Sequence, residues 1–440
     1  MTAPSRDDTF CAILNRELVC ALGCTEPIAV AYAAALARET LGAEPERLEA
    51  HCSGNIVKNV KSVTVPNSEG MRGIEAAATL GAVGGDAASA LEVLESVTPA
   101  HIARTRELLS REGGFYCEVS LTEGVPNLYI RVTAHAAGHV AEVVISEHHT
   151  NVAYRALDGT VLEGSAKAAT GTRATRAGKD AYAADDGLSL DAILAFAERG
   201  DIEPARTALE RQIELNCAIS QEGLDHVWGA QVGQTLMQAS GPSTATRARA
   251  RAAAGSDARM NGCAMPVVIV CGSGNQGITA CLPVVEYASK LGVSRDRLLR
   301  ALALSDLVAI HVKRHIGALS AFCGVVCAAC GAGAAITWMS GGTPEQVGAT
   351  IVNALGNVGG IVCDGAKASC AAKISAAVDA AILGSSMAMA GRGFQAGEGL
   401  VQETVEETIA SMGYVGRVGM ASTDVEILNI MLGKTDVGGC

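Results

Sequence analysis

The 440-residue sequence has few aromatic side chains and no long run of charge of one sign. Phe, Trp and Tyr make up 3% of the residues, and the net charge of −12 comes without any stretch of five or six consecutive Lys or Arg. Proteins that follow a phosphate backbone usually carry such a basic stretch. We therefore expect no nucleic acid partner.

The N-terminus also lacks the apolar stretch that a secretory signal requires. Residues 1–10 instead include Arg6, Asp7 and Asp8. We expect a cytoplasmic protein, and in a reducing compartment its 15 cysteines are not expected to form a disulfide framework. The cysteines are then packing residues, metal ligands or catalytic groups.

Hydrophobic residues are abundant, at 49% of the chain, which is enough for a large core and about two or three domains. The uncharged segment 316–340 is long enough to span a membrane. Its content of Ala, Gly, Cys and Ser favours a helix packed closely among other helices. No membrane partner is expected.

The residue pattern predicts an α+β fold, with a large all-helical lobe beside a smaller α/β lobe. β-rich runs at residues 115–121, 128–134 and 139–145 predict the sheet of the smaller lobe. The predicted divisions are N-terminal helices that pack on the helical lobe at 1–48, the α/β lobe at 49–160, a loop or linker at 161–187, and the helical, cluster-binding lobe at 188–440.

The first candidate motif is the G-x-G-x-x-G pattern at residues 272–277, which follows an apolar run. A dinucleotide site is not favoured, because no second parallel strand is expected afterwards and Pro283 lies inside the following helix. The side chains of Ser273, Asn275 and Gln276 could instead hold a small carboxylate.

The second motif is Cys323-x-x-x-Cys327-x-x-Cys330, which has the spacing of the cluster motif in radical S-adenosylmethionine enzymes. It lies in a segment that predicts an unbroken helix. Cysteines on one helix face are more often core residues than ligands. At most one of the three is therefore expected to bind a metal.

The third motif contains Cys363 and Cys370, separated by a short polar insert and preceded by two glycines. Such a loop has room to wrap an iron-sulfur cluster. Zinc is less favoured, because paired C-x-x-C spacing and a nearby His are absent. Three thiolates that leave one iron corner open would suit catalysis.

Cys24 comes directly before a predicted helix start at Thr25, Glu26 and Pro27. The positive end of a helix dipole lowers the pKa of a thiol, so Cys24 is a candidate base or nucleophile. A buried cysteine beside a helix cap is the alternative reading.

Sequence blocks in a characteristic order extend over nearly the whole chain. They are Gly-Cys-Thr-Glu-Pro at 23–27 and the segments 63–66, 149–151, 215–224, 256–260, 272–280, 319–323 and 363–365 with Cys370. With these blocks the chain resembles the L-cysteine desulfidase family, relatives of the catalytic chain of iron-sulfur L-serine dehydratases. The resemblance implies a fold like that of the serine dehydratase alpha chain.

The resemblance also implies a [4Fe-4S] cluster on Cys323, Cys363 and Cys370, with Cys24 as the catalytic residue. The implied reaction is β-elimination of L-cysteine to sulfide, ammonia and pyruvate, in which Cys24 takes the Cα proton. The candidate substrate-binding residues are Ser273, Asn275, Gln276, Asn55, Lys61, His149, Thr150 and Asn151.

Several alternatives stay open at this point. The same groups could dehydrate L-serine or another small amino acid, or the chain could be a non-catalytic metal-binding redox protein. Cys281, Cys327 and Cys330 are additions to the family pattern, and the terminal Cys440 is a candidate cap for the open iron. A homodimer is the default expectation for a soluble enzyme of this size.

Overall fold

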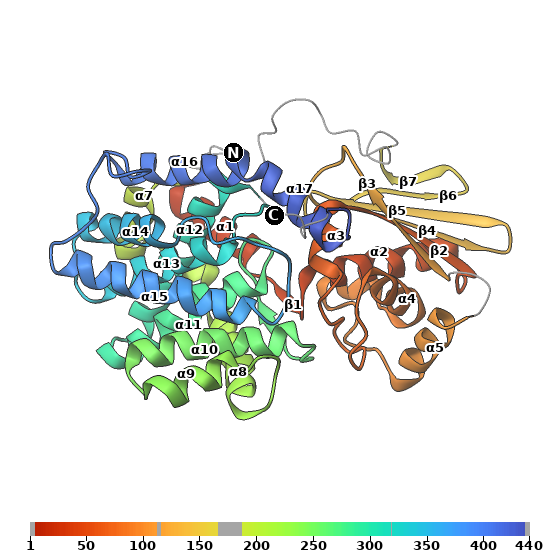
Figure 1. The fold of residues 1–440 in the computed structure, drawn as a ribbon, viewed down its shortest axis with the longest axis horizontal. Coiled ribbons are helices and arrows are strands. Elements are labelled where there is room, and N and C mark those ends of the chain that lie inside the picture. Colours follow the sequence, from red (N-terminus) through yellow and green to blue (C-terminus); the bar gives the residue numbers. More distant parts are fainter. Residues whose placement is uncertain (1–4, 112–115, 166–186, 318, 436–440) are drawn as a thin grey trace.

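The computed structural model describes residues 5–111, 116–165, 187–317 and 319–435. In Figure 1 a group of packed helices lies on one side, and a sheet with its covering helices lies on the other. The α+β class predicted from the sequence is confirmed. Most of the predicted loop at 161–187, together with Cys440, lies outside the described residues.

The main sheet has six strands in the order β3-β2-β4-β5-β6-β7, and only the β2–β3 pair is parallel. The three predicted β-rich runs correspond to β3, β4 and β5. The β6–β7 hairpin was missed, because β7 is exposed at every position and offers no alternating pattern. The strands are β2 (Arg47–Ser53), β3 (Cys117–Thr122), β4 (Tyr129–Ala136), β5 (His139–Ser146), β6 (Val152–Leu157) and β7 (Thr160–Gly164).

Helix α2 (Thr25–Leu41) packs against β4, β5 and α4 (Ile74–Gly84). The expectation that all N-terminal helices pack on the helical lobe is therefore wrong for α2, although α1 (Arg6–Glu17) does contact α12. The reason lies in the Ala-rich surface of α2, which fits closely under α4. A Cβ on Gly81 of α4 would lie only 2.2 Å from the carbonyl oxygen of Ala31. The elements that complete this side are α3 (Gly54–Val60), η1 (Ala87–Glu92) and α5 (Pro99–Leu109).

The helical group surrounds α13, which packs against α11, α12, α14 and α15 and is buried along almost its whole length. Small residues allow this density: a Cβ on Gly331 would lie 2.1 Å from the carbonyl oxygen of Ser305 in α12. The helices are α7 (Leu190–Arg199), η2 (Glu203–Ala205), α8 (Arg206–Asp225), α9 (Val232–Ser240), α10 (Thr244–Met260), α11 (Gly274–Leu291), α12 (Arg295–Ile316), α13 (Gly324–Met339), α14 (Pro344–Val358), α15 (Cys370–Met389), α16 (Val405–Tyr414), η3 (Val415–Gly419) and α17 (Ala421–Met431).

The uncharged segment 316–340 is not one helix. α12 ends at Ile316, because Gly317 takes a φ of +98° that favours glycine, and α13 begins only at Gly324. Among the described residues, α15 alone is long and apolar enough to cross a membrane by length and composition. It also packs against α10, α13 and α14, with 56% of its apolar window buried, as a core helix would be.

A second, two-stranded sheet joins the chain's start to the glycine motif. β1 (Cys20–Leu22) pairs antiparallel with β8 (Pro266–Val268), and α11 follows with Pro283 inside it. The parallel strands that a dinucleotide fold would need are thus missing from the described part of the chain around this motif. The glycine motif is available for another role.

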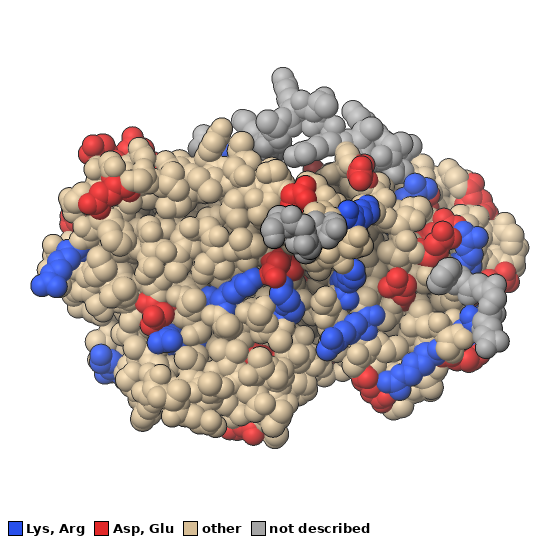
Figure 2. All heavy atoms as spheres, in the orientation of Figure 1, with Lys and Arg blue, Asp and Glu red and all other residues tan. Residues whose placement is uncertain are grey.

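The face drawn in Figure 2 is unevenly charged. Acidic and basic residues are interspersed over the sheet side, whereas the helical side of this face carries few of either sign. Neither sign dominates this face, so it offers no single-sign patch for a polyanion.

Asp306 is a buried carboxyl group in the middle of α12. Its Oδ1 accepts a hydrogen bond from Gln212 at 2.9 Å, while Oδ2 has no partner among the described residues. Burial raises the pKa of Asp306 to about 7 from its ordinary 3.8. The stability that this group contributes is therefore present below about pH 4 and is lost as the pH rises through 7.

We expect Asp306→Asn to raise the midpoint of thermal unfolding, with a gain that grows between pH 4 and 8. The gain above pH 7 should be on the order of 4 kcal/mol, because the pKa is raised from 3.8 to about 7 and the neutral amide has no charge to bury. Asp296→Asn is the matched control on the same helix, where a hydrogen bond from Arg300 lowers the pKa of the carboxyl. That control should lose a little stability above pH 4. A gain from Asp306→Asn that does not vary with pH would contradict the assignment.

Candidate active site

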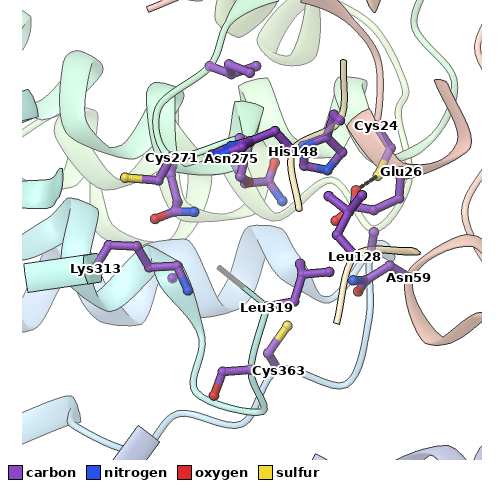
Figure 3. Close-up of a pocket in the computed structure, with 18 of the residues that line it drawn as sticks. Cys24, Glu26, Asn59, Leu128, His148, Cys271, Asn275, Lys313, Leu319 and Cys363 are labelled. Carbon is purple, nitrogen blue, oxygen red and sulfur yellow. Dashed lines mark hydrogen bonds between the residues drawn. The ribbon is translucent and has the colours of Figure 1, made fainter. Parts of the chain in front are cut away.

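A cavity of about 470 Å³ lies where loops of the sheet side face loops of the helical group (Figure 3). The start of α2 and residues 147–151 line it from the sheet side. Residues between 269 and 276, between 319 and 325 and between 363 and 370 line it from the helical side. A cavity built from several distant segments is the usual setting for a small-molecule site.

Cys24 is the N-cap residue of α2, as the sequence predicted, and it lines the cavity. Its buried Sγ donates a hydrogen bond to Oε2 of Glu26 at 3.1 Å (Figure 3). The expectation that the helix dipole lowers the pKa of this thiol is wrong here. Burial and the Glu26 carboxylate raise the pKa of Cys24 well above its usual range. Cys24 is therefore a protonated thiol, with Glu26 in position to accept its proton.

Cys323, Cys363 and Cys370 come from three separate segments and line this same cavity. Cys323 is the N-cap of α13, Cys363 lies in the loop after α14, and Cys370 is the first residue of α15. Two backbone hydrogen bonds join the first two segments. The Cys323 N–H donates to Ile361 O at 2.9 Å, and the Cys363 N–H donates to Ala321 O at 2.6 Å.

The structure corrects one part of the cysteine prediction. Cys323 was expected inside an unbroken helix, but it has an extended backbone (φ −69°, ψ 122°) and lies outside α13. Cys327 and Cys330 are fully buried within that helix and do not line the cavity. The three positions therefore do not share one helix face, and only Cys323 reaches the site.

Two ammonium groups lie behind Cys363, and each is also paired with a carboxylate, Lys58 with Asp424 and Lys373 with Asp364. Lys58 donates to the carbonyl oxygen of Cys363 at 3.4 Å, and Lys373 donates to that of Val362 at 2.8 Å. The hydrogen bond from the Cys323 thiol, together with these ammonium groups, lowers the pKa of Cys363. The same hydrogen bond and burial raise the pKa of Cys323. Of the two thiols, Cys363 is therefore the one that loses its proton more readily.

The three thiols fit an iron-sulfur cluster in donor type, because thiolates are the ligands that such clusters prefer. Within the described residues no three metal-binding side chains already stand at coordinating spacing. The Sγ of Cys370 donates to Gly365 O at 3.7 Å. The Cys370 side chain would have to rotate toward Cys323 and Cys363 to share a cluster with them. The loop between Cys363 and Cys370 can pack this closely on α3 only with glycine at position 365, because a Cβ there would lie 2.4 Å from the Lys58 carbonyl oxygen.

The glycine-motif side chains Ser273, Asn275 and Gln276 all line the cavity, as predicted. Asn275 Oδ1 accepts a hydrogen bond from Arg259 at 3.1 Å. Gln276 Oε1 is buried and has no hydrogen-bond partner among the described residues. A buried acceptor without a partner is costly unless a ligand or water satisfies it.

Residues 149–151 also line the cavity, as predicted. His149 Nε2 is buried without a partner among the described residues, and burial lowers the pKa of this ring, so it is neutral at pH 7. Gly272 leaves room for the ring, since a Cβ there would lie 3.0 Å from His149 Cε1. Asn151 donates to Ser146 O at 2.9 Å, which holds the turn that carries His149 and Thr150.

Asn55 and Lys61 do not line the cavity, so the structure does not support their prediction as substrate contacts. Both hold the C-terminal helix α17 against α3 (Figure 1). Asn55 donates to Asp424 at 2.8 Å, and Lys61 donates to the carbonyl oxygen of Met431. The buried Lys58 forms an ion pair with Asp424. These polar residues hold α17 against α3, and Lys58 also links it to the loop that carries Cys363.

We expect Asp424→Ala to lower the free energy of unfolding by about 3 kcal/mol, because it leaves the buried Lys58 ammonium without its partner. Amide hydrogen exchange in α17 should rise as well. Replacing both partners, as Lys58→Met with Asp424→Leu, should recover most of the loss. Glu426→Ala, at an exposed position of the same helix, is the control and should change stability by less than about 0.5 kcal/mol. An unchanged unfolding curve for Asp424→Ala would contradict this role.

Six charged residues of the cavity received no role from the sequence, and Glu26, Arg259 and Lys313 are the three that bear on the chemistry below; the others are Arg16, Glu17 and Glu147. Glu26 and Arg259 lie inside sequence blocks 23–27 and 256–260, so those blocks were the signal that could have found them. Lys313 is buried near the end of α12 and lines the cavity. It belongs to no motif, so only the fold could place it in the site.

Comparison with known proteins identifies the class of protein that this fold and thiol-lined cavity define. Residues 88–429 match the family model of the serine dehydratase alpha chain, and the chain belongs to that family. The family indicates a lyase-type enzyme and is generally iron-sulfur dependent. The relationship to iron-sulfur serine dehydratase chains expected from the sequence is confirmed.

Individual relatives match over almost their full length. A UPF0597 protein of Desulfitobacterium hafniense is 46% identical over 426 residues, which is 97% of both chains. One from Lachnoclostridium phytofermentans is 47% identical over 420 residues, covering 96% of this chain and 98% of its own. One from Finegoldia magna is 46% identical over 426 residues, covering 97% and 99%.

Proposed function

We propose that this chain is an iron-sulfur-dependent L-cysteine desulfidase, which eliminates sulfide from L-cysteine to give ammonia and pyruvate. The observation that carries the proposal is that Cys24 and the three candidate ligands are four of the five thiols that line one cavity, the fifth being Cys271. Cys24 lies at its sheet side, and Cys323, Cys363 and Cys370 lie at its helical side. A base and a set of ligands must share one cavity with the substrate, and these four thiols do so although they come from distant parts of the chain.

Cys323, Cys363 and Cys370 are the residues that would hold a [4Fe-4S] cluster. When bound, a cluster held by three thiolates supplies an open iron position that acts as a Lewis acid toward a departing heteroatom. Lys58 and Lys373, each paired with a carboxylate, would support the backbone of the Cys363 segment by donating to its carbonyl groups. The hydrogen-bonded segments 321–323 and 361–363 fix two of the three thiols relative to each other.

Cys24 and Glu26 would move the proton. Elimination requires removal of the Cα proton, and the 3.1 Å hydrogen bond allows Glu26 to take the thiol proton from Cys24 first. The resulting Cys24 thiolate would then accept the Cα proton. Arg259 favours that thiolate electrostatically, because its charge lowers the pKa of Cys24 against the effects of burial and Glu26.

The remaining cavity residues would orient the amino acid. His149 Nε2 and Gln276 Oε1 have no hydrogen-bond partner among the described residues. In the neutral ring, Nε2 would accept a hydrogen bond from the substrate amino group, as Gln276 Oε1 would. Ser273 and Asn275 stand at the start of α11, where the helix dipole favours an anion.

L-serine dehydration is the second candidate, and the serine dehydratase family match favours it. The two can be separated by anaerobic assays of sulfide release from L-cysteine and pyruvate formation from L-serine at equal concentrations. Our proposal expects L-cysteine to have the higher kcat/KM. Pyruvate from L-serine without sulfide from L-cysteine would establish the second candidate. A colourless, zinc-loaded protein without either activity would indicate a structural metal site.

A further inference from the structure

Arg259 is a buried guanidinium at the end of α10 that faces the cavity. It is only 2% exposed, yet it forms no ion pair with a carboxylate among the described residues. Its Nη1 donates to Asn275 Oδ1 at 3.1 Å and touches the Met260 sulfur at 4.0 Å, while its Nε has no partner. The side chain passes against Gly274, where a Cβ would lie 2.3 Å from Nε.

A permanent charge in this position is costly unless an anion compensates it. Arg stays protonated in proteins, so it cannot escape the cost of burial by losing its proton as a Lys or His can. Neutral Asn275 satisfies one N–H but supplies no negative charge. The Glu26 carboxylate, which acts on the same Cys24 thiol, forms no ion pair with Arg259 among the described residues. The open side of the guanidinium therefore has the chemistry of an anion site, and its planar fork matches a carboxylate.

We propose that Arg259, together with Asn275, binds the α-carboxylate of the amino acid substrate and so selects amino acids over simple amines. This assignment rests on the proposed function for the identity of the substrate as an α-amino acid. In this role Arg259 positions the substrate relative to Cys24, the proposed base.

The position of Arg259 relative to the other reacting groups supports the proposal. Its charge influences both Cys24 and His149, so it lies at the same end of the cavity as the proposed base. A carboxylate held there brings the adjacent Cα–H toward Cys24. Lys313 is the rival anchor, but it influences Cys271 and Cys327 instead, and in Figure 3 it extends from the side of the cavity opposite Cys24.

The test is anaerobic isothermal titration calorimetry on the iron-loaded protein with two probes, L-alanine and ethylamine. L-alanine has no leaving group and cannot react, and ethylamine is the same molecule without its carboxylate. We expect the wild-type protein to bind L-alanine and to bind ethylamine at least about 30-fold more weakly. Arg259→Met should weaken L-alanine binding by a similar factor and leave ethylamine binding unchanged, so that the preference disappears. Arg259→Lys should restore part of it.

Arg249→Met is the matched control, because Arg249 lies on the same helix, pairs with Asp379 at 3.0 Å and does not line the cavity. It should keep the wild-type preference. Cluster absorption and thermal unfolding of each variant establish that it is folded. The proposal is overturned if wild type binds the two probes equally or does not bind L-alanine, if Arg259→Met keeps the preference, or if Lys313→Met alone abolishes it.

Sulfide release from L-cysteine, measured on the same samples, separates this inference from the proposed function. Wild-type protein that binds L-alanine through Arg259 but releases no sulfide rejects the desulfidase and keeps the anchor. Wild-type protein that releases sulfide, with Arg259→Met unchanged in its preference, rejects only the anchor.

Discussion

Cys24→Ala is expected to lose turnover by a factor of about 10² to 10⁴ while keeping the visible absorption of the cluster. The reason is positional. Cys24 lies on a different side of the cavity from Cys363 in Figure 3, and its thiol donates a hydrogen bond to Glu26, so removing its sulfur removes the proposed base without removing a proposed ligand. The measurement is sulfide release from L-cysteine by anaerobically purified protein, normalised to iron content.

Cys281→Ala is the control for this prediction, because Cys281 is also fully buried but does not line the cavity. It should retain nearly all of the activity. Loss of cluster absorption in Cys24→Ala would make Cys24 a ligand and remove it as the base. The turnover of Glu26→Gln should lie between that of wild type and that of Cys24→Ala, since the Cys24 thiol would remain but would lose its proton acceptor.

Cys363→Ala is expected to lose both the cluster and all measurable turnover. The hydrogen bond from Cys323 lowers the pKa of Cys363, and Lys58 and Lys373 donate to the backbone carbonyl groups of Cys363 and Val362. Removing one of three ligands leaves two thiols, which are too few to hold a four-iron cluster in the manner proposed. The measurement is iron content together with visible absorption after anaerobic purification.

Cys327→Ala separates this prediction from the alternative cysteine motif. Cys327 lies four residues after Cys323 but is buried in α13, away from the cavity. The variant should bind as much iron as wild type. If Cys327→Ala lost its iron while Cys363→Ala kept it, the cluster would belong to the 323–330 motif and the proposed ligand set would be wrong.

The sequence was sufficient to predict the residues that meet in the cavity wherever a local block carried them. Cys24, the 273–276 side chains, residues 149–151 and the three candidate ligands all line it. Each of these lies at a helix start, in a turn or beside glycines, where local chemistry sets the backbone. The strands β3, β4 and β5 were likewise predicted, because their apolar residues are continuous or alternate clearly.

The features of the site that the sequence did not predict depend on long-range packing, which no local pattern encodes. The pKa of Cys24 follows from its burial and from Glu26 rather than from the helix dipole alone. Asn55 and Lys61 were predicted as substrate contacts, but both form hydrogen bonds with α17, which lies more than 360 residues later in the chain. Gly317 ends α12 and so frees Cys323 from a helix that the apolar run appeared to continue.

The most direct test of the whole account is to load the iron-free protein stepwise with iron and sulfide under anaerobic conditions and to measure sulfide release from L-cysteine at each step. The account predicts that activity rises with bound iron and reaches its maximum at about four iron atoms per chain. Full activity in iron-free protein, or a fully loaded protein that releases no sulfide, would contradict it.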